Sequence, residues 1–278
     1  MSGSRFDHLE LDEAVSPPPR ESPAVRSGGG MFVSDPSHRL TTAVRDAPYH
    51  LAQAEKHLLA GDFEKALRSY SAALGQDPLA LDAWVGQIQM LLELGECREA
   101  SLWADKALES FPDNPRILSV KAVALHRMGL ERQGRDLSDA ALSGKGECPL
   151  VWLYRGALML DGGRPAAESC FESALRLAGA RRGMLQLHIG SFWLQHGEAR
   201  QAVSALQEAT RLHPASAWAW YLLGAARDAL GFFEEARMCY RQAVGLAPDN
   251  ALFRNAATAG KPGIVQRLRG FLSRLAAH

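Results

Sequence analysis

The four cysteines are the residues of this chain best suited to chemistry, because a thiolate can bind a metal, form a disulfide or act as a nucleophile. Consecutive cysteines are 51, 22 and 69 positions apart, and no Cys-x-x-Cys pair occurs. They are Cys97, Cys148, Cys170 and Cys239. A zinc site or a disulfide framework would place them closer together in the sequence. We therefore expect four reduced thiols in or near helix packing, and no metal site.

The other residue types that carry out catalysis are dispersed. His50 and His57 lie two helical turns apart, whereas a metal would want one-turn spacing and further ligands. Gly144-Lys145 and Gly260-Lys261 lack the upstream glycine of a phosphate-binding loop, and neither Gly-x-Ser-x-Gly nor His-Glu-x-x-His occurs. We expect no catalytic residue, no cofactor and no small-molecule substrate, so the chain is predicted not to be an enzyme.

Composition and charge restrict the class of protein further. The 278 residues carry 31 Lys and Arg against 31 Asp and Glu, so no basic excess favours nucleic acid, which becomes an unlikely partner. Hydrophobic residues make up 47% of the chain, which is enough for a core. No apolar stretch approaches the roughly 20 residues of a membrane-spanning helix, and residues 1–13 contain no apolar signal core. We expect a soluble, cytoplasmic protein.

The chain divides into three parts by composition. Residues 1–46 contain Ser16-Pro17-Pro18-Pro19 and Gly28-Gly29-Gly30, which interrupt any helix or strand, so we predict a disordered tail. Residues 47–250 are rich in alanine, leucine, glutamate and arginine, which predicts an almost entirely α-helical body. Residues 251–278 carry basic side chains and no acid.

The body repeats itself every 34 residues. Several small or rigid residue types keep this spacing, and such self-similarity is typical of repeat architectures. The glycines in register are Gly61, Gly95, Gly129, Gly163, Gly197 and Gly231. The other residues in register include Pro78, Pro112, Pro214 and Pro248, then Trp84, Trp152 and Trp220, and Ala66, Ala100, Ala202 and Ala236. We predict that each glycine reverses the chain between two helices, each alanine lets helices approach closely, and each proline ends the second helix.

These residues resemble the tetratricopeptide repeat family. The unit 217–250 has the family's pattern most completely, at Trp220, Leu223, Gly224, Gly231, Phe233, Ala236, Tyr240, Ala243 and Pro248. The resemblance implies an all-α, right-handed α-solenoid of six tandem helix-turn-helix repeats, followed by capping helices. Its expected units are 47–80, 81–114, 115–148, 149–182, 183–216 and 217–250. The third and fourth units depart from the pattern, so we expect the weakest junction there, with a hinge at 143–149.

The resemblance also implies where a ligand would bind, because peptides lie in the concave groove of this family. The family's contact positions correspond here to Glu55, Asp82, Gln89, Glu93, Arg116, Ser119, His126, Arg127, Asp161, Leu187, Ser191, Gln195, Trp218, Tyr221 and Asp228. The groove is expected to be acidic in the first two units, basic in the third and aromatic in the sixth. Each of these residues could instead be an ordinary surface or packing residue. The Lys and Asn clamp that grips chaperone tails is absent, since Leu51, Glu55, Val85 and Gln89 stand at its positions.

The two ends of the chain leave alternatives open. Ile264, Leu268, Leu272 and Leu275 recur at helical spacing in 263–278, beside Arg267, Arg269 and Arg274. This pattern predicts a basic amphipathic helix, which either caps the last repeat, the option we favour, or contacts an anionic membrane or partner. In the tail, Phe6, Leu9 and Leu11 stand among acids and could form a short docking motif.

We therefore expect a non-enzymatic scaffold or adaptor that binds peptide segments of a protein partner in its concave groove. The alternative is an electrostatic docking protein that uses the basic C-terminal helix on an anionic membrane or nucleic acid. The first hypothesis makes binding depend on groove residues, and the second on the C-terminal arginines, with strong salt dependence.

Overall fold

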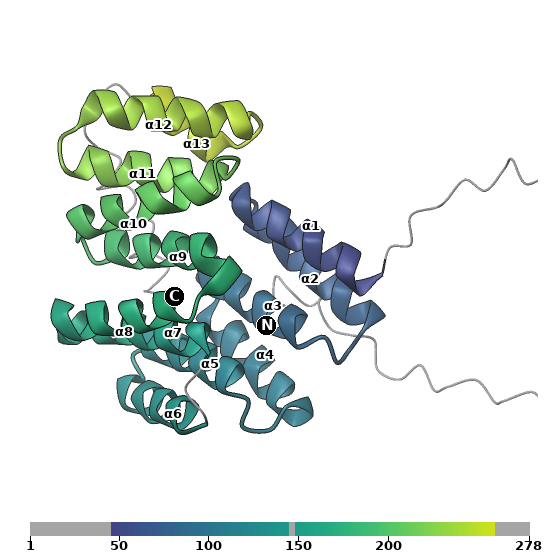
Figure 1. The fold of residues 1–278 in the computed structure, drawn as a ribbon. Coiled ribbons are helices and arrows are strands. Elements are labelled where there is room, and N and C mark those ends of the chain that lie inside the picture. The colour runs from purple at the N-terminus through teal and green to yellow at the C-terminus, as the bar shows by residue number, and fades with distance from the viewer. Residues whose placement is uncertain (1–45, 145–147, 259–278) are drawn as a thin grey trace, which may run out of the picture.

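The computed structural model describes residues 46–144 and 148–258, and within them the fold is a stack of paired helices (Figure 1). The first helices of the successive pairs are α1 (Ala47–Leu59), α3 (Leu81–Glu93), α5 (Pro115–Arg127), α7 (Pro149–Met159), α9 (Arg182–Gln195) and α11 (Ala217–Ala229). The second helices are α2 (Phe63–Gln76), α4 (Cys97–Ser110), α6 (Glu131–Ser143), α8 (Arg164–Arg176), α10 (Ala199–Leu212) and α12 (Phe233–Leu246). A last helix, α13 (Ala251–Thr258), follows them, and no strand occurs in these residues. The predicted all-α helical-repeat fold is confirmed.

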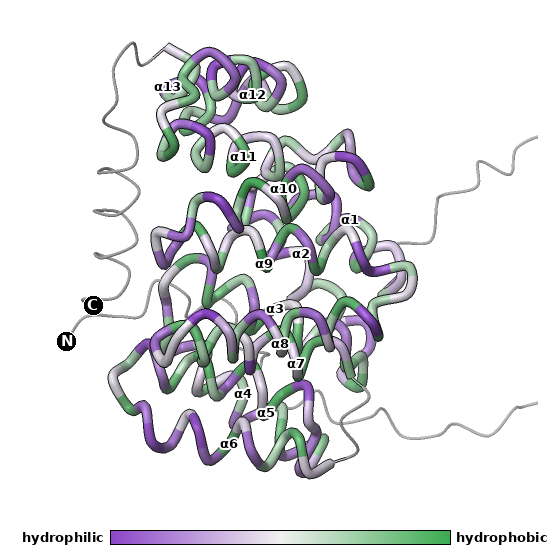
Figure 2. Tube along the Cα trace, turned by 60° about the vertical axis from the view of Figure 1, so that its left-hand side comes forward, coloured by the Kyte–Doolittle hydropathy of each residue, from purple (hydrophilic) through white to green (hydrophobic). Residues whose placement is uncertain are grey.

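The residues that recur every 34 positions have the roles expected of them. All six glycines in register have a positive φ, from 75° at Gly61 to 124° at Gly163, a conformation that other residues rarely adopt. The alanines five residues later, such as Ala66 and Ala100, are fully buried between helices. Hydrophobic and hydrophilic stretches alternate along the helices (Figure 2), and the apolar faces share one main core.

The fourth pair has a different turn from the others. A short 3₁₀ helix, Leu160–Gly162, extends α7, and α8 begins directly after Gly163, whereas the other second helices begin two residues after their glycine. Ala167, which stands one residue earlier than its equivalents, is nevertheless fully buried. The shorter turn therefore compensates for the shift in the alanine.

Contacts between neighbouring pairs are uneven along the stack. The second helix of a pair packs broadly on the first helix of the next at α2–α3, α4–α5 and α10–α11, but narrowly at α6–α7 and α8–α9. A small separate cluster of Leu118, Ala141 and Val151 bridges α5, α6 and α7. The second helices of the third and fourth pairs, α6 and α8, thus hold the next pair less firmly, whereas α5 and α7 pack broadly on each other. Part of the predicted hinge, 145–147, lies outside the described residues.

The stack curves so far that its first pair meets its last (Figure 1). Ser216 Oγ, at the start of α11, donates a hydrogen bond to the Leu59 carbonyl at the end of α1, with 3.1 Å between the oxygens. The rings of Phe63 and Trp218 meet edge to face, with centroids 5.0 Å apart. A Cβ added to Gly61 would lie 2.9 Å from the Phe253 ring of α13, so glycine is required for this approach. We call these contacts the closing junction.

The two ends of the chain lie outside the described residues. The predicted disordered tail falls there except for Asp46, which caps α1 by accepting a hydrogen bond from the Tyr49 amide. The predicted first capping helix corresponds to α13, whose Phe253 is fully buried against the last pair. The predicted basic helix at 263–278 is outside the described range, as are the hypotheses that depend on it.

Candidate protein-binding surface

The first helices contact one another in sequence around the curve, from α3 through α5, α7 and α9 to α11, so they form its inner side. Most of the fifteen groove residues predicted from the sequence lie on these helices. The structure brings many of them into contact with one another rather than leaving them free.

Asp82 and Arg116 form an ion pair between α3 and α5. Arg116 Nη2 lies 2.5 Å from Asp82 Oδ1, and Arg181 approaches the same carboxylate to 3.8 Å. Partial burial raises the pKa of Asp82, but hydrogen bonding to Arg116 and the two positive charges outweigh it, so the pKa is lowered overall. One acid from the predicted acidic region of the groove and one arginine from the predicted basic region therefore neutralise each other. Ser119, one turn along α5, is buried and donates to the Arg116 carbonyl.

Gln89 reaches across the inner side to Tyr154 of α7. Its side-chain amide donates to the Tyr154 hydroxyl at 2.7 Å. The tyrosine is fully buried, and burial raises the pKa of its hydroxyl. This bond joins the second pair to the fourth across the inner side.

His126, Asp161 and His196 form a polar cluster between three successive pairs. His126 Nε2 lies 2.6 Å from Asp161 Oδ2, and His196 Nε2 lies 3.4 Å from Asp161 Oδ1. The carboxylate of Asp161 is thus shared between two imidazoles. The cluster fixes the turn after α7, where Asp161 belongs to the 3₁₀ segment.

Arg127 links the second, third and fifth pairs. It donates to the Leu92 carbonyl at 2.8 Å and to the Gln195 side chain at 3.3 Å, and Gln195 donates in turn to Ser191. Beside this chain, Glu93 lies 3.9 Å from His188, which is fully buried. Burial lowers the pKa of His188 although the Glu93 charge opposes this, so the imidazole is neutral near pH 7.

Trp218 and Tyr221 stack on each other in α11, with ring centroids 5.3 Å apart and planes 19° apart. Phe253 lies against both rings. Tyr221 is completely buried, so it packs in the core, whereas Trp218 remains partly accessible at the closing junction. Only Trp218 of the two is therefore exposed to a ligand.

The other predicted residues have varied surroundings. Glu55 is exposed on α1, and Leu187 is buried in α9. Asp228 is half-buried in α11, where burial raises its pKa and its Oδ2 has no hydrogen-bond partner. These residues are not brought together with the rest of the predicted groove.

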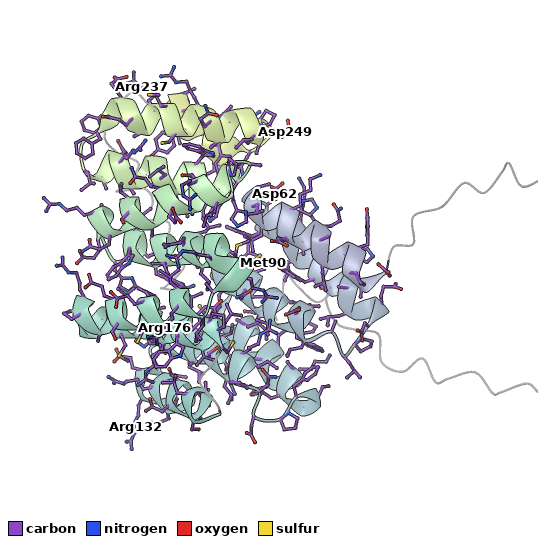
Figure 3. All side chains as sticks on the ribbon, in the orientation of Figure 1. Asp62, Met90, Arg132, Arg176, Arg237 and Asp249 are labelled. Atoms are coloured by element: carbon purple, nitrogen blue, oxygen red, sulfur yellow. The ribbon has the colours of Figure 1, made fainter. Side chains whose placement is uncertain are left out.

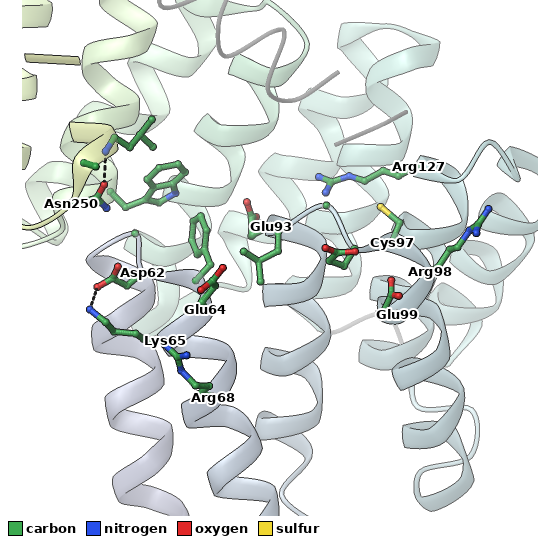
Figure 4. A pocket seen from close by; sticks show the side chains of 18 of the residues that line it. Asp62, Glu64, Lys65, Arg68, Glu93, Cys97, Arg98, Glu99, Arg127 and Asn250 are labelled. Atoms are coloured by element: carbon green, nitrogen blue, oxygen red, sulfur yellow. Dashed lines mark hydrogen bonds and ion pairs between the residues drawn. The ribbon is translucent and has the colours of Figure 1, made fainter. Parts of the chain in front are cut away.

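A cavity of about 1360 Å³ opens beside the closing junction (Figure 4). Its walls are the turns that end α1, α3 and α5, the first turns of α2 and α4, Trp218, and residues 249–252. Asp62, from the first pair, and Asp249, which follows the last helix pair, both line it and lie in the same region of the molecule (Figure 3). We call it the junction cavity. Four of the predicted groove residues line it, namely Glu93, His126, Arg127 and Trp218.

The junction cavity combines an apolar wall with a charged one. Phe63, Trp218 and the exposed Leu252 form the apolar part. Among the described lining residues, six are acidic and four are Lys or Arg, which gives a net charge of −2. Glu64 and Glu93 lie between two flanks that carry the basic side chains (Figure 4). Such a mixture suits a polypeptide segment with both apolar and charged side chains better than a uniformly apolar ligand.

Sequence reasoning missed the lining residues from the starts of α2 and α4 and from 249–252. The missed set includes Phe63, Lys65, Arg68, Cys97, Arg98, Asn250 and Leu252. They belong to turns and second helices, outside the groove positions of the repeat pattern. No signal within one repeat identifies them, because the cavity exists only where two distant repeats meet.

The sequence profile of tetratricopeptide repeats matches residues 51–127 and 194–251, in agreement with the helix pairs and their glycines. The chain belongs to the tetratricopeptide repeat family. The unmatched stretch between the two matches contains the fourth pair with its altered turn. No curated protein matches the sequence significantly.

Solved structures resemble this tetratricopeptide repeat protein in fold. Human IFIT1, as a dimer with m7Gppp-AAAA, is 16% identical over 82% of this chain and 59% of that one, with a TM-score of 0.54. A chain of the APC/C hetero-tetramer Cut9–Hcn1 is 15% identical over 79% of this chain and 44% of that one, with a TM-score of 0.49. PilW, a type IV pilus biogenesis factor, is 18% identical over 76% of this chain and 98% of that one, with a TM-score of 0.47. The chain spans less than two thirds of the length of the IFIT1 chain and of the Cut9–Hcn1 chain.

Among the described residues, no group of three or more His, Cys, Asp or Glu residues could hold a metal ion. No helix among them is long and apolar enough to cross a membrane.

Proposed function

We propose that this tetratricopeptide repeat protein is a non-enzymatic scaffold that binds a segment of a partner protein in the junction cavity. Proteins with this fold typically mediate protein–protein interactions. The observation that carries the proposal is the cavity itself, which is large, open to solvent and lined by a partly accessible tryptophan. Tryptophan and arginine are the residues that most often dominate binding energy at interfaces.

The polar contacts of the inner side support a preformed binding surface. Arg127 is fixed by the Leu92 carbonyl and Gln195, and Trp218 is packed between Phe63 and Tyr221. A side chain that is already ordered loses little entropy when a ligand arrives. The ordering cost of binding therefore falls mainly on the partner.

The partner is proposed to bind at only one end of the inner side, and not along the whole groove predicted from the sequence. Asp82, Arg116, Gln89 and Asp161 interact with other residues of the chain and do not line the junction cavity. We therefore place the partner on Glu93, His126, Arg127 and Trp218, together with the missed lining residues.

The proposed setting is the cytoplasm, with a protein or peptide partner and neither a small-molecule substrate nor a cofactor. All four cysteines are free thiols, as expected in a reducing compartment. The cavity contains charged groups of both signs, which gives nucleic acid no continuous basic track.

A matched pair of exposed leucines tests the proposal. Leu252 lines the cavity and Leu102 lies on α4 outside it, and both side chains are well exposed, so Leu252→Glu and Leu102→Glu should both fold. Tagged wild type and both variants are used to capture partners from the source cells, with quantitative mass spectrometry. We expect specific partners to fall at least fivefold with Leu252→Glu and to persist with Leu102→Glu. Equal recovery of every protein with all three baits would contradict the proposal.

A further inference from the structure

The junction cavity and the chain that follows α13 have complementary chemistry. The described lining residues carry a net charge of −2 and include an apolar wall of Phe63, Trp218 and Leu252. Residues 259–278 contain Lys261, Arg267, Arg269 and Arg274 and no acid, together with a stripe of apolar side chains at helical spacing. Opposite charge and matching apolar surface are the features that select one partner over others.

The chain also leads directly from the cavity. Ala251 and Leu252, in the first turn of α13, line it, and α13 extends for eight residues, or about 12 Å at 1.5 Å per residue. About five extended residues span roughly 16 Å, so the chain can return to the cavity from residue 264 onward. A segment joined by so short a connection has an effective concentration in the millimolar range.

The volume of the cavity limits what can enter it. A helix with its side chains is about 10–12 Å wide and rises 5.4 Å per turn. A cavity of about 1360 Å³ therefore accepts two or three turns. The run from 264 to 275, which carries the apolar stripe and three arginines, would make slightly more than three turns, so nearly all of it fits.

We propose that residues 264–275 of the same chain bind in the junction cavity and occupy it until a partner displaces them. The inference rests on the proposed function, because it treats the cavity as the binding surface for a polypeptide. Arginines of the segment pair with acidic side chains that line the cavity, and its apolar stripe covers Phe63, Trp218 and Leu252. The partner that displaces it is accordingly a basic segment with apolar side chains.

Site-specific cross-linking in the full chain tests the position of the segment. Phe271 is replaced by the photoreactive residue p-benzoylphenylalanine, and cross-linked peptides are identified by mass spectrometry. We expect most products to be intramolecular and to join position 271 to residues 61–68, 93–99, 218 or 249–252. Products on the outer face of α12, around Met238, would mean that the segment only caps the stack. Products between two molecules, or none, would equally overturn the proposal.

A charge-reversed chain supplies the control. Arg267→Glu, Arg269→Glu and Arg274→Glu in the same labelled protein should lower the cavity cross-links at least fivefold, and unchanged cross-links would contradict the charge complementarity. The unlabelled triple variant should also recover at least threefold more partner in the capture experiment, because the cavity is vacated. If the segment is cross-linked to the cavity but the capture experiment recovers no partner, only the proposed function is refuted. If capture depends on Leu252 but the segment is not cross-linked to the cavity, only the proposal for residues 264–275 is refuted.

Discussion

The indole of Trp218 and the ring of Phe63 meet edge to face with their centroids 5.0 Å apart, although they belong to the last and first helix pairs. Ser216 and Leu59 are hydrogen-bonded beside them. In most helical repeat proteins each repeat contacts only its neighbours, and stability is close to a sum over nearest neighbours. Here one additional interface connects the two ends of the stack, and the junction cavity lies next to it.

Gly61→Ala should weaken the closing junction, and Gly129→Ala is its matched control. Both glycines have φ near 80°, so both substitutions lower the free energy of unfolding by about 1 kcal/mol. Only at Gly61 would the new Cβ meet the rings of Phe253 and Trp218, at 2.9 and 3.1 Å, whereas it meets nothing at Gly129. Urea denaturation should show Gly61→Ala to be less stable than Gly129→Ala by a further 1–3 kcal/mol. Equal losses would mean that the ends do not meet in solution.

His188 should make the protein less stable in mild acid. Its pKa in the folded chain is below 6.5 because of burial, so below about pH 6.5 the unfolded chain binds a proton that the folded chain does not. The free energy of unfolding therefore decreases as the pH decreases, by at most about 1.4 kcal/mol per pH unit for this group. Urea midpoints at pH 7.5 and 5.5 should differ less for His188→Gln than for wild type. The same pH dependence in both proteins would show that another group is responsible.

The second helices of the third and fourth pairs should open first in the native state. The α6–α7 and α8–α9 interfaces are narrow, and few buried apolar contacts lower the free energy of local opening. In native-state hydrogen exchange, amides of α6 and α8 should lose protection before those of α3, α5 and α11. If residues 115–182 proved to be the best-protected part of the chain, the packing argument would be wrong.

The sequence was sufficient for the helix pairs but not for the way the stack closes. The 34-residue period of glycines such as Gly95 and Gly197 corresponds directly to turns with positive φ, because that conformation has a strong residue preference. The contact of Phe63 with Trp218 depends instead on the small rotation between successive pairs, summed over the whole stack. No local residue preference encodes that sum.

The sequence predicted the part of the candidate site that follows the repeat pattern, but not the part formed where the first and last pairs meet. The repeat pattern correctly puts Asp82 and Arg116 at the same position of successive repeats, 34 residues apart. Opposite charges at equivalent positions were a signal that these groove residues pair with each other. The lining contributed by Arg98 or Leu252 had no such signal, since these residues line one cavity only because the first and last pairs meet.

The most direct test of the account is a double-mutant cycle between Phe63 and Trp218, because the closing junction underlies both the cavity and its proposed occupants. Free energies of unfolding are measured for wild type, Phe63→Ala, Trp218→Ala and the double variant. A control cycle pairs Phe63→Ala with Phe233→Ala, since Phe233 is exposed. We predict a coupling of about 0.5–1.5 kcal/mol between Phe63 and Trp218 and none beyond about 0.5 kcal/mol between Phe63 and Phe233. Additive losses for Phe63 and Trp218 would contradict the account.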